Sequence, residues 1–208
     1  MKLTFAFLTL CFALSAQVLP VIDAAPGTQL CILNDSDQTV GYNIQFREPL
    51  GSPAQPVFDS FGPQAALLGG LAPQAIACYT FTEPGIYWAT NVSPFGKPRI
   101  FALSNSGVLR TQVPEVRRTL PWFELNANTE IVFVNTGETP VSAAAIYRER
   151  NGVEVFRSET VVGPYQQVRL RLDFECLRDL NGSVTLIDTL NLGTLVTAAH
   201  FAPKGVVY

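Results

Sequence analysis

Two stretches of this chain resemble copies of one another, and that repeat constrains the fold more than any single motif. They are Leu30–Arg47 (LCILNDSDQTVGYNIQFR) and Ile131–Arg148 (IVFVNTGETPVSAAAIYR). Aligned without a gap, they place Asn34 on Asn135, and each consists of an apolar run, a polar turn cluster and a segment of alternating apolar residues. Because side chains alternate between the two faces of a β-strand, the alternation predicts strands with one buried face.

The repeat predicts two tandem domains in a chain of 208 residues. Apolar residues make up 48% of the chain, which is enough for two cores. Charged residues make up 15%, below the roughly 25% usual in soluble proteins, so uncharged polar residues must cover much of the surface. Fifteen glycines and fifteen prolines interrupt the chain, which favours many short strands over long helices.

The N-terminus has the pattern of a secretory signal peptide. Lys2 supplies the positive charge, Phe5–Leu14 is the apolar stretch, and small residues follow, with candidate cleavage sites after Ala16 and Ala24. The apolar stretch is shorter than the roughly 20 residues that cross a bilayer. We therefore assign residues 1–24 to a signal peptide and expect a secreted, periplasmic or cell-surface protein without a membrane span.

Removal of the signal peptide would leave three cysteines, Cys31, Cys78 and Cys176. An exported protein can form disulfides, and Cys31 with Cys78 is the candidate pair because both lie in predicted strands of the first half. The alternative is a free thiol, because the second copy has Val132 at the position of Cys31 and a buried cysteine packs like a small hydrophobic residue.

Residues 25–110 and 129–208 are assigned to the two domains, with residues 111–128 as a linker whose Trp122 and Phe123 are expected to pack between them. The proline-rich segment Glu48–Pro73 contains a candidate edge strand at Pro56–Ser60 and a candidate helical turn at Ala65–Leu71. The other predicted strands are Gln29–Asn34, Thr39–Arg47, Gln74–Thr82, Gly85–Asn91, Pro98–Ser104, Glu130–Val134, Pro140–Arg148, Val153–Val161, Gln166–Phe174, Ser183–Asp188 and Leu195–Phe201.

The second half shows a fixed order of strand and turn signals. An apolar strand ends in Val134-Asn-Thr-Gly137, an alternating strand follows, and Asn151-Gly152 marks a hairpin before the Gly163-Pro164 entry to the next strand. This order resembles the immunoglobulin-like modules of secreted bacterial proteins over residues 130–201, and less closely over residues 30–103. The resemblance implies two all-β, Greek-key β-sandwich domains with a structural or binding role, and it brings no catalytic residues.

The sequence offers little for catalysis or metal binding. His200 is the single histidine, and no Gly-x-Ser-x-Gly elbow accompanies it. The Phe81–Tyr87 corner is similar to a turn of copper proteins, but a blue-copper site needs two histidines and a cysteine. Asp35 and Asp37 fit a polar turn better than a calcium site. We therefore expect no enzyme activity and no cofactor.

Two sets of residues are candidates for a binding surface. Exposed arginines on the second half would attract an acidic polysaccharide. Aromatic residues near the proline-rich segment would either stack on sugar rings or close the end of the sandwich. The alternative for the arginines is an ordinary solvated strand face. The candidate residues are Arg148, Arg150, Arg169, Arg171, Phe58 and Phe61. Three Asn-x-Ser acceptor patterns begin at Asn34, Asn91 and Asn181.

These observations predict a non-catalytic β-sandwich protein with a structural, adhesive or binding role. Its expected partners are a protein or glycan at the cell surface, with self-association through strand edges, and the net charge of −3 gives no case for nucleic acid. One alternative is a periplasmic chaperone-like or ligand-binding module, for which Arg99–Leu103 is the candidate donor strand. The other is a glycan hydrolase that uses carboxylates such as Glu149, Glu154 and Glu159.

Overall fold

The computed structural model describes residues 17–104, 107–124, 129–171, 181–201 and 206–207. Every regular element in these residues is a β-strand, and every paired strand runs antiparallel to its neighbour. No helix in this part of the chain has the length and apolar character needed to cross a bilayer. The all-β class expected from the sequence is therefore confirmed.

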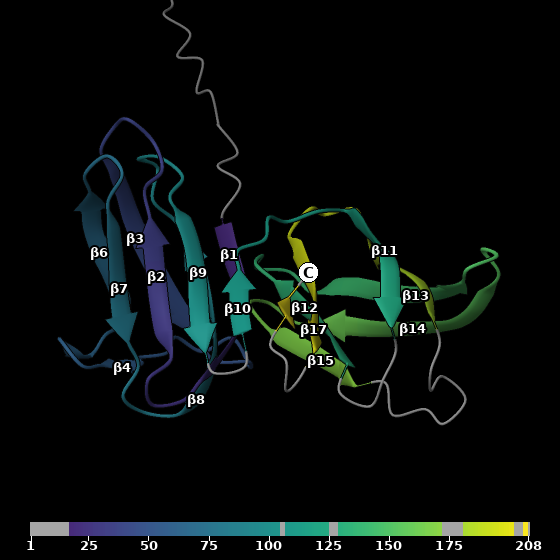
Figure 1. The fold of residues 1–208 in the computed structure, drawn as a ribbon. Coiled ribbons are helices and arrows are strands. Elements are labelled where there is room, and N and C mark those ends of the chain that lie inside the picture. Colours follow the sequence, from purple (N-terminus) through teal and green to yellow (C-terminus); the bar gives the residue numbers. More distant parts are fainter. Residues whose placement is uncertain (1–16, 105–106, 125–128, 172–180, 202–205, 208) are drawn as a thin grey trace, which may run out of the picture.

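The first half of the chain forms two four-stranded sheets and a short hairpin (Figure 1). One sheet has the strand order β1-β8-β3-β6 and the other has the order β10-β9-β2-β7, while β4 pairs with β5. The bounds are β1 Gln17–Ala24, β2 Gln29–Leu33, β3 Val40–Arg47, β4 Val57–Phe58, β5 Gly62–Pro63, β6 Ala66–Leu71, β7 Ile76–Thr80, β8 Gly85–Asn91, β9 Arg99–Ser104 and β10 Gly107–Arg110.

The second half repeats the two four-stranded sheets, and its described residues contain no counterpart of the β4-β5 hairpin. Its sheets have the orders β11-β16-β13-β14 and β15-β12-β17-β18, which match those of the first half when β11 is placed on β1 and β18 on β10. The bounds are β11 Arg117–Glu124, β12 Thr129–Asn135, β13 Val141–Glu149, β14 Glu154–Val162, β15 Gln167–Arg171, β16 Asn181–Asp188, β17 Leu195–Phe201 and β18 Val206–Val207.

Each half encloses its own core between its two sheets. In the first half the largest side chains of this core are Phe46, Phe58 and Phe81. The buried Trp88 lies on the other face of its sheet, beside Arg47. In the second half Phe133 and Ile131 of one sheet pack with Tyr147 and Val141 of the other. The alternating residues of the repeat motif therefore supply one layer of each core, as their periodicity indicates.

The sheet assignment differs from the constant-type immunoglobulin scheme in three of the seven main strands of each half. In an immunoglobulin domain the first strand shares a sheet with the second and fifth, and the seventh strand joins the third and sixth. Here β1 pairs with β8, while β9 pairs with β2. The first and seventh strands have thus exchanged sheets, and the fourth strand, β6 or β14, pairs with the third, β3 or β13, rather than joining the sheet of the second and fifth.

Three stretches differ from the expectations drawn from the sequence. Residues Ala66–Leu71 form strand β6, which pairs with β3 along its length, so the helical turn expected at Ala65–Leu71 is wrong. Arg117–Glu124, placed in the linker, form β11 at the edge of a sheet. Gln17–Ala24, counted with the signal peptide, form β1 in the first half. The strand expected at Gln166–Phe174 is present as β15 over Gln167–Arg171, and residues 172–174 lie outside the described residues.

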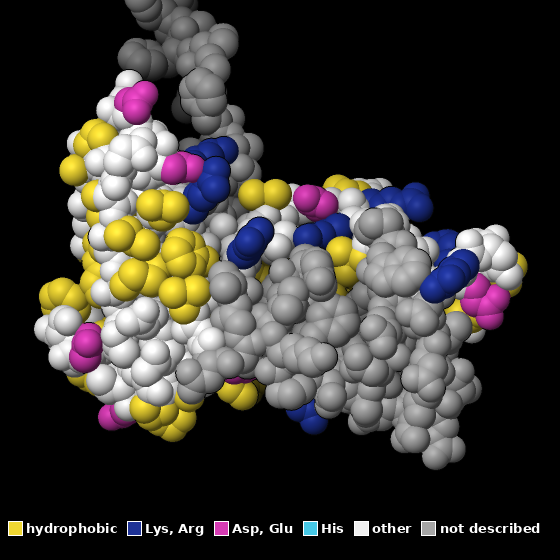
Figure 2. Space-filling model, viewed as in Figure 1, with side chains coloured by type: hydrophobic (Ala, Val, Ile, Leu, Met, Phe, Trp, Pro, Cys, Tyr) yellow, Lys and Arg dark blue, Asp and Glu magenta, His cyan; other side chains and the backbone are white. Residues whose placement is uncertain are grey.

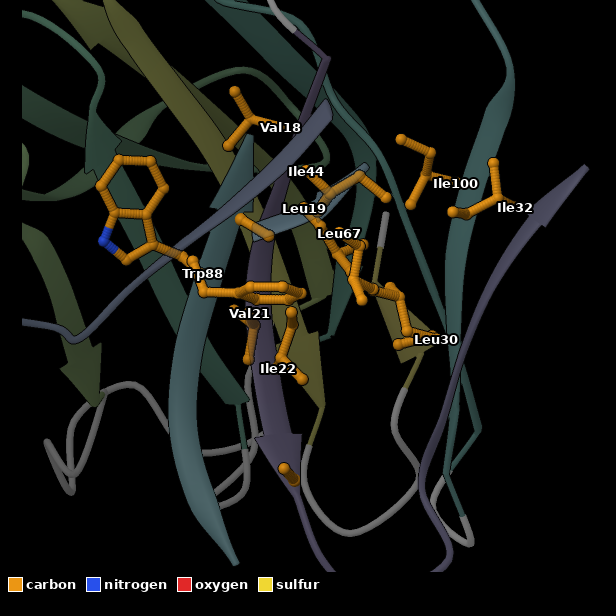
Figure 3. Close-up of a cluster of buried hydrophobic side chains, with 14 of the residues drawn as sticks. Val18, Leu19, Val21, Ile22, Leu30, Ile32, Ile44, Leu67, Trp88 and Ile100 are labelled. Atoms are coloured by element: carbon orange, nitrogen blue, oxygen red, sulfur yellow. The ribbon is translucent and has the colours of Figure 1, made fainter. Parts of the chain in front are cut away.

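Strand β1 is the main contact between the two halves. It forms the edge of its sheet next to the second half (Figure 1), and its pattern of burial is nearly continuous. Val18, Leu19, Val21 and Ile22 of β1 belong to the core of the first half (Figure 3). The same apolar cluster continues into outward-facing residues of β12 and β17, which are Val132, Val134, Val196 and Ala198.

A second contact joins the loop after β3 to the loop before β15. The Gln167 backbone N–H donates to the Pro49 carbonyl at 2.8 Å. The guanidinium of Arg47 lies 4.1 Å from the centre of the Tyr165 ring and donates to the Gly51 carbonyl at 2.8 Å. Gly51 has a φ of +93°, and a Cβ there would lie 2.9 Å from the Tyr165 carbonyl oxygen. Only glycine fits this close approach.

Candidate functional site

The two predicted aromatic residues lie in different environments. Phe58 is 1% exposed and packs between Phe46 and Phe81, with ring centres 5.7 and 4.7 Å away. It is therefore a core residue and cannot stack on a sugar ring. Phe61 is 58% exposed and contacts Tyr79 at 5.9 Å, so it stays available at the surface.

The four predicted arginines do not form one patch. Arg148 lies on β13, in a different sheet from the β15 residues Arg169 and Arg171. Arg169 forms a bidentate ion pair with Asp23 of β1, at 2.7 and 3.2 Å. This ion pair joins the second half of the chain to the first. Arg171 pairs with Glu130 at 2.6 Å.

The hairpin between β13 and β14 carries mixed charges. Arg148 and Arg157 each lie 3.6 Å from Glu154, and Arg157 lies 3.1 Å from Glu159. Arg150 is exposed at the turn. These side chains form cross-strand and neighbouring ion pairs of the kind found on solvated sheet faces.

Among the described residues, no group of three His, Cys, Asp or Glu side chains has the arrangement of a metal site. His200 lies in β17, where its backbone pairs with Glu130 and Val207. Strand β9 lies between β2 and β10, so both of its edges are occupied. The Arg99–Leu103 segment is therefore not free to act as a donor strand.

A feature not predicted from the sequence is an apolar sheet face in the first half that none of the described residues covers. Strands β2 and β9 direct Leu30, Ile32 and Ile100 into the core, and β7 packs Ala77 and Tyr79 against it. The residues between them therefore point outward. Figure 2 shows hydrophobic side chains gathered over these three strands. We call this surface the open face, and it consists of Leu33, Ile76, Cys78, Phe101 and Leu103.

A disulfide crosses the middle of the open face. Cys31 of β2 and Cys78 of β7 are direct partners in the strand register, and their sulfur atoms are bonded. Phe101 of β9 lies on the other side of Cys31 in the same register. Cys31 itself is fully buried and Ile76 at the rim is 56% exposed. The sulfurs thus fix the spacing of the two strands that carry most of the face.

The same face of the second half is covered. Val132 and Val134 occupy the positions of Cys31 and Leu33 in the repeat, and both are 0% exposed because β1 packs over them. Gln167 and Arg169 occupy the positions of Ile76 and Cys78, and they bind the Pro20 carbonyl and the Asp23 carboxylate of β1. Strand β1 therefore covers this face in the second half, whereas no described element covers it in the first half.

No protein-family model matches the chain, and no curated protein or solved structure is significantly similar to it.

Proposed function

We propose that this chain is an exported, non-catalytic binding protein, and that the open face of its first half is the surface that contacts a protein partner. The observation that carries the proposal is the comparison of the two halves. One sheet face, repeated in the same fold, is buried under β1 in the second half. In the first half it presents Ile76 at 56% exposure beside partly exposed Leu33 and Phe101.

The chemistry of the open face favours a protein over a glycan or a nucleic acid. Its centre is apolar and aromatic, with Gln29 and Thr80 at one end of the same face, and an apolar centre with polar surroundings is typical of protein contact sites. At one end Arg99 pairs with Asp35 at 2.7 Å, which gives the apolar centre a charged rim. The exposed Phe61 belongs to the β4-β5 hairpin beside Tyr79, so a glycan there would occupy a separate site.

The disulfide supports the proposed export. Cys31 and Cys78 are bonded to each other on the face that would meet a partner, and such bonds persist in oxidising compartments such as the periplasm or the extracellular space. The disulfide therefore supports a location outside the cytoplasm, whether the protein is secreted, periplasmic or at the cell surface.

The proposal is tested by placing a charge on the open face. Ile76→Lys introduces a charge at its exposed rim, and Leu68→Lys is the matched control because Leu68 is 70% exposed on β6 of the opposite sheet. We expect wild type and Leu68→Lys to self-associate or to bind a cell-surface protein, measured by light scattering and surface plasmon resonance. Ile76→Lys should weaken that binding at least tenfold. Equal binding by all three proteins, or no binding by wild type, would contradict the proposal.

A further inference from the structure

The position of β1 indicates where the exported form of the chain begins. The apolar N-terminal stretch is followed by two candidate cleavage sites, after Ala16 and after Ala24. Each has alanine on the N-terminal side of the bond and an aliphatic residue, Leu14 or Ile22, two positions earlier. The small-residue pattern therefore does not distinguish them, but the fold of the residues between them does.

These residues form a strand that is buried on both sides. Val18, Val21 and Ile22 are 0% exposed and Leu19 is 1% exposed. Figure 3 shows the four side chains in one apolar cluster with Ile44 and Trp88. A segment destined for removal has no reason to supply four core side chains, whereas a permanent strand requires them.

The polar groups of the segment also have partners in the rest of the fold. Backbone pairing with β8 runs from Gln17, opposite Asn91, to Ala24, opposite Gly85, with a bulge between Leu19 and Ile22. Val18 and Gln112 exchange two backbone hydrogen bonds of 2.8 and 2.6 Å. Asp23 forms the ion pair with Arg169 across the junction of the two halves. Removing residues 17–24 would leave all of these partners unsatisfied.

We propose that a leader peptidase cuts this chain immediately before β1 and that Gln17–Ala24 remain in the mature protein. The step is hydrolysis, in which water adds across one peptide bond to leave a carboxylate on the leader and a free amine on the mature chain. Two adjacent bonds have small residues on their N-terminal side, Ala16–Gln17 and Ser15–Ala16, and the latter also has Ala13 two positions before Ser15. This inference rests on the proposed export and corrects the signal-peptide boundary from residue 24 to residue 15 or 16.

The first test is the intact mass of the full chain after expression in a secreting host. We expect the purified exported protein to begin at Ala16 or Gln17, with or without the loss of ammonia that accompanies cyclisation of an N-terminal glutamine. A folded, exported protein that begins at Ala25 would overturn the cleavage inference and leave the export proposal intact. A chain that keeps Met1 and stays in the cytoplasm would overturn both.

The second test compares two chains that need no peptidase. One begins at Gln17 and the other at Ala25, each after an initiating methionine and each produced under conditions that form the Cys31–Cys78 disulfide. We expect the chain from Gln17 to unfold in one cooperative transition. The chain from Ala25 should aggregate or lose roughly 10 °C or more in Tm, because it lacks a core strand. Equal Tm values for the two chains would count against a permanent β1.

Discussion

At the scale of single residues, the most informative pair is Asn34 and Asn135. Both are buried, and each amide makes the same contacts. The Asn34 side-chain NH₂ donates to the carbonyls of Gln38, Leu71 and Ala72 at 2.7 to 3.1 Å. That of Asn135 donates to three equivalent carbonyls at 2.7 to 3.2 Å. Each asparagine therefore joins its own turn to the end of an edge strand, β6 or β14, and the first residue of the loop that follows it, which explains why the repeat retains it.

We expect Asn135→Asp to lower the free energy of unfolding by about 2–4 kcal/mol. The substitution keeps the shape of the side chain but replaces its N–H donors by an acceptor that faces three carbonyl oxygens. Urea denaturation at pH 7 measures the change. Asn151→Asp is the matched control, because Asn151 lies in an exposed turn and should change stability by no more than about 0.5 kcal/mol. Equal effects of the two substitutions would show that the hydrogen bonds of the buried Asn135 side chain are unimportant for stability.

Burial of Asn34 and Asn91 affects whether these side chains can carry a glycan. Asn34 is 1% exposed and Asn91 is 5% exposed, although both begin an Asn-x-Ser acceptor pattern. The Asn91 side-chain oxygen also accepts the backbone N–H of Asn43 at 3.0 Å. A glycan on either side chain would break these contacts, so neither site is compatible with the folded structure.

A buried tyrosine predicts how stability depends on pH. Tyr147 is 2% exposed, and desolvation raises the pKa of its phenol well above the usual value. In the unfolded chain the phenol ionises near pH 10, so above that pH the unfolded state binds fewer protons than the native state. Stability should therefore be unaffected by this group below about pH 9 and should fall as the pH rises beyond about 10.

We expect Tyr147→Phe to reduce this alkaline loss of stability. The experiment compares urea denaturation of wild type and variant at about pH 8 and about pH 10.5. The difference between the two pH values should be smaller for the variant, because its side chain cannot ionise. Identical pH dependence in the two proteins would mean that Tyr147 does not control the alkaline transition.

At the scale of the element, the Cys31–Cys78 disulfide is the strongest constraint on β2 and β7. It closes a loop with a sequence separation of 47 residues that contains the whole proline-rich segment. Restricting so long a loop in the unfolded chain stabilises the native state. The second half holds the equivalent strands together without a disulfide, through the pairing of β12 with β15.

We expect the double variant Cys31→Ala/Cys78→Ala to lose about 2–4 kcal/mol of unfolding free energy. Denaturation of the oxidised wild type, the reduced wild type and the variant measures the effect. Reduced wild type and variant should agree within about 1 kcal/mol, since both lack the cross-link. A variant as stable as oxidised wild type would contradict this account.

The alternation of apolar residues was sufficient to predict most strands, because most have one face in a core and one in solvent. Gly85–Asn91 and Leu195–Phe201 were predicted with the bounds that the structure gives. Strand β6 was missed because its sequence, Ala66–Leu71, is continuously apolar and contains two consecutive glycines. Glycine weakens a strand signal, and a short apolar run without alternation does not distinguish a strand from a helical turn.

Strands β1 and β11 were missed for a related reason. Each has a bulge at the same place, between Leu19 and Ile22 and between Leu120 and Phe123, which interrupts the alternation of side chains. The repeat nevertheless extends through them without a gap, since Leu19-Pro20 aligns with Leu120-Pro121. This match is not apparent while Gln17–Ala24 are counted with the signal peptide and Arg117–Glu124 with the linker.

The candidate site was less predictable than the fold. Charged and aromatic residues were selected from the sequence by type, but Phe58 lies in the core and Arg169 joins the two halves. The open face consists of residues that are ordinary strand residues in the sequence. Its significance depends on which sheet is covered by β1, and this is a property of tertiary packing.

At the scale of the whole molecule, the two halves share apolar contacts and are expected to unfold together. Val196 and Ala198 of β17 belong to the same buried cluster as Val18 and Val21 of β1. The four buried aliphatic side chains of β1, which are Val18, Leu19, Val21 and Ile22, stabilise the fold by roughly 1.5–3 kcal/mol each. Their total is comparable to the stability of a whole domain. The β1 contact is therefore large enough to couple the two unfolding equilibria.

Scanning calorimetry of wild type should show one transition, with equal calorimetric and van't Hoff enthalpies. We expect Val196→Asp to separate it into two transitions, because a carboxylate cannot remain charged against β1 without a large penalty. Val161→Asp is the control, since Val161 is 64% exposed on β14, and it should preserve a single transition. Two transitions in wild type would show that the halves are thermodynamically independent.

The placement of β1 also affects the order in which a translocated chain assembles. An N-terminus delivered first brings out β1 long before β8, its partner in the ladder, and longer still before β12 and β17, which cover its other side. The earliest strand to emerge is thus among the last to be completed, and its apolar residues stay unprotected until most of the polypeptide has crossed. Slow delivery would prolong this interval, so the yield of native protein should depend on the rate of translocation and on holdase chaperones that shield the waiting strand.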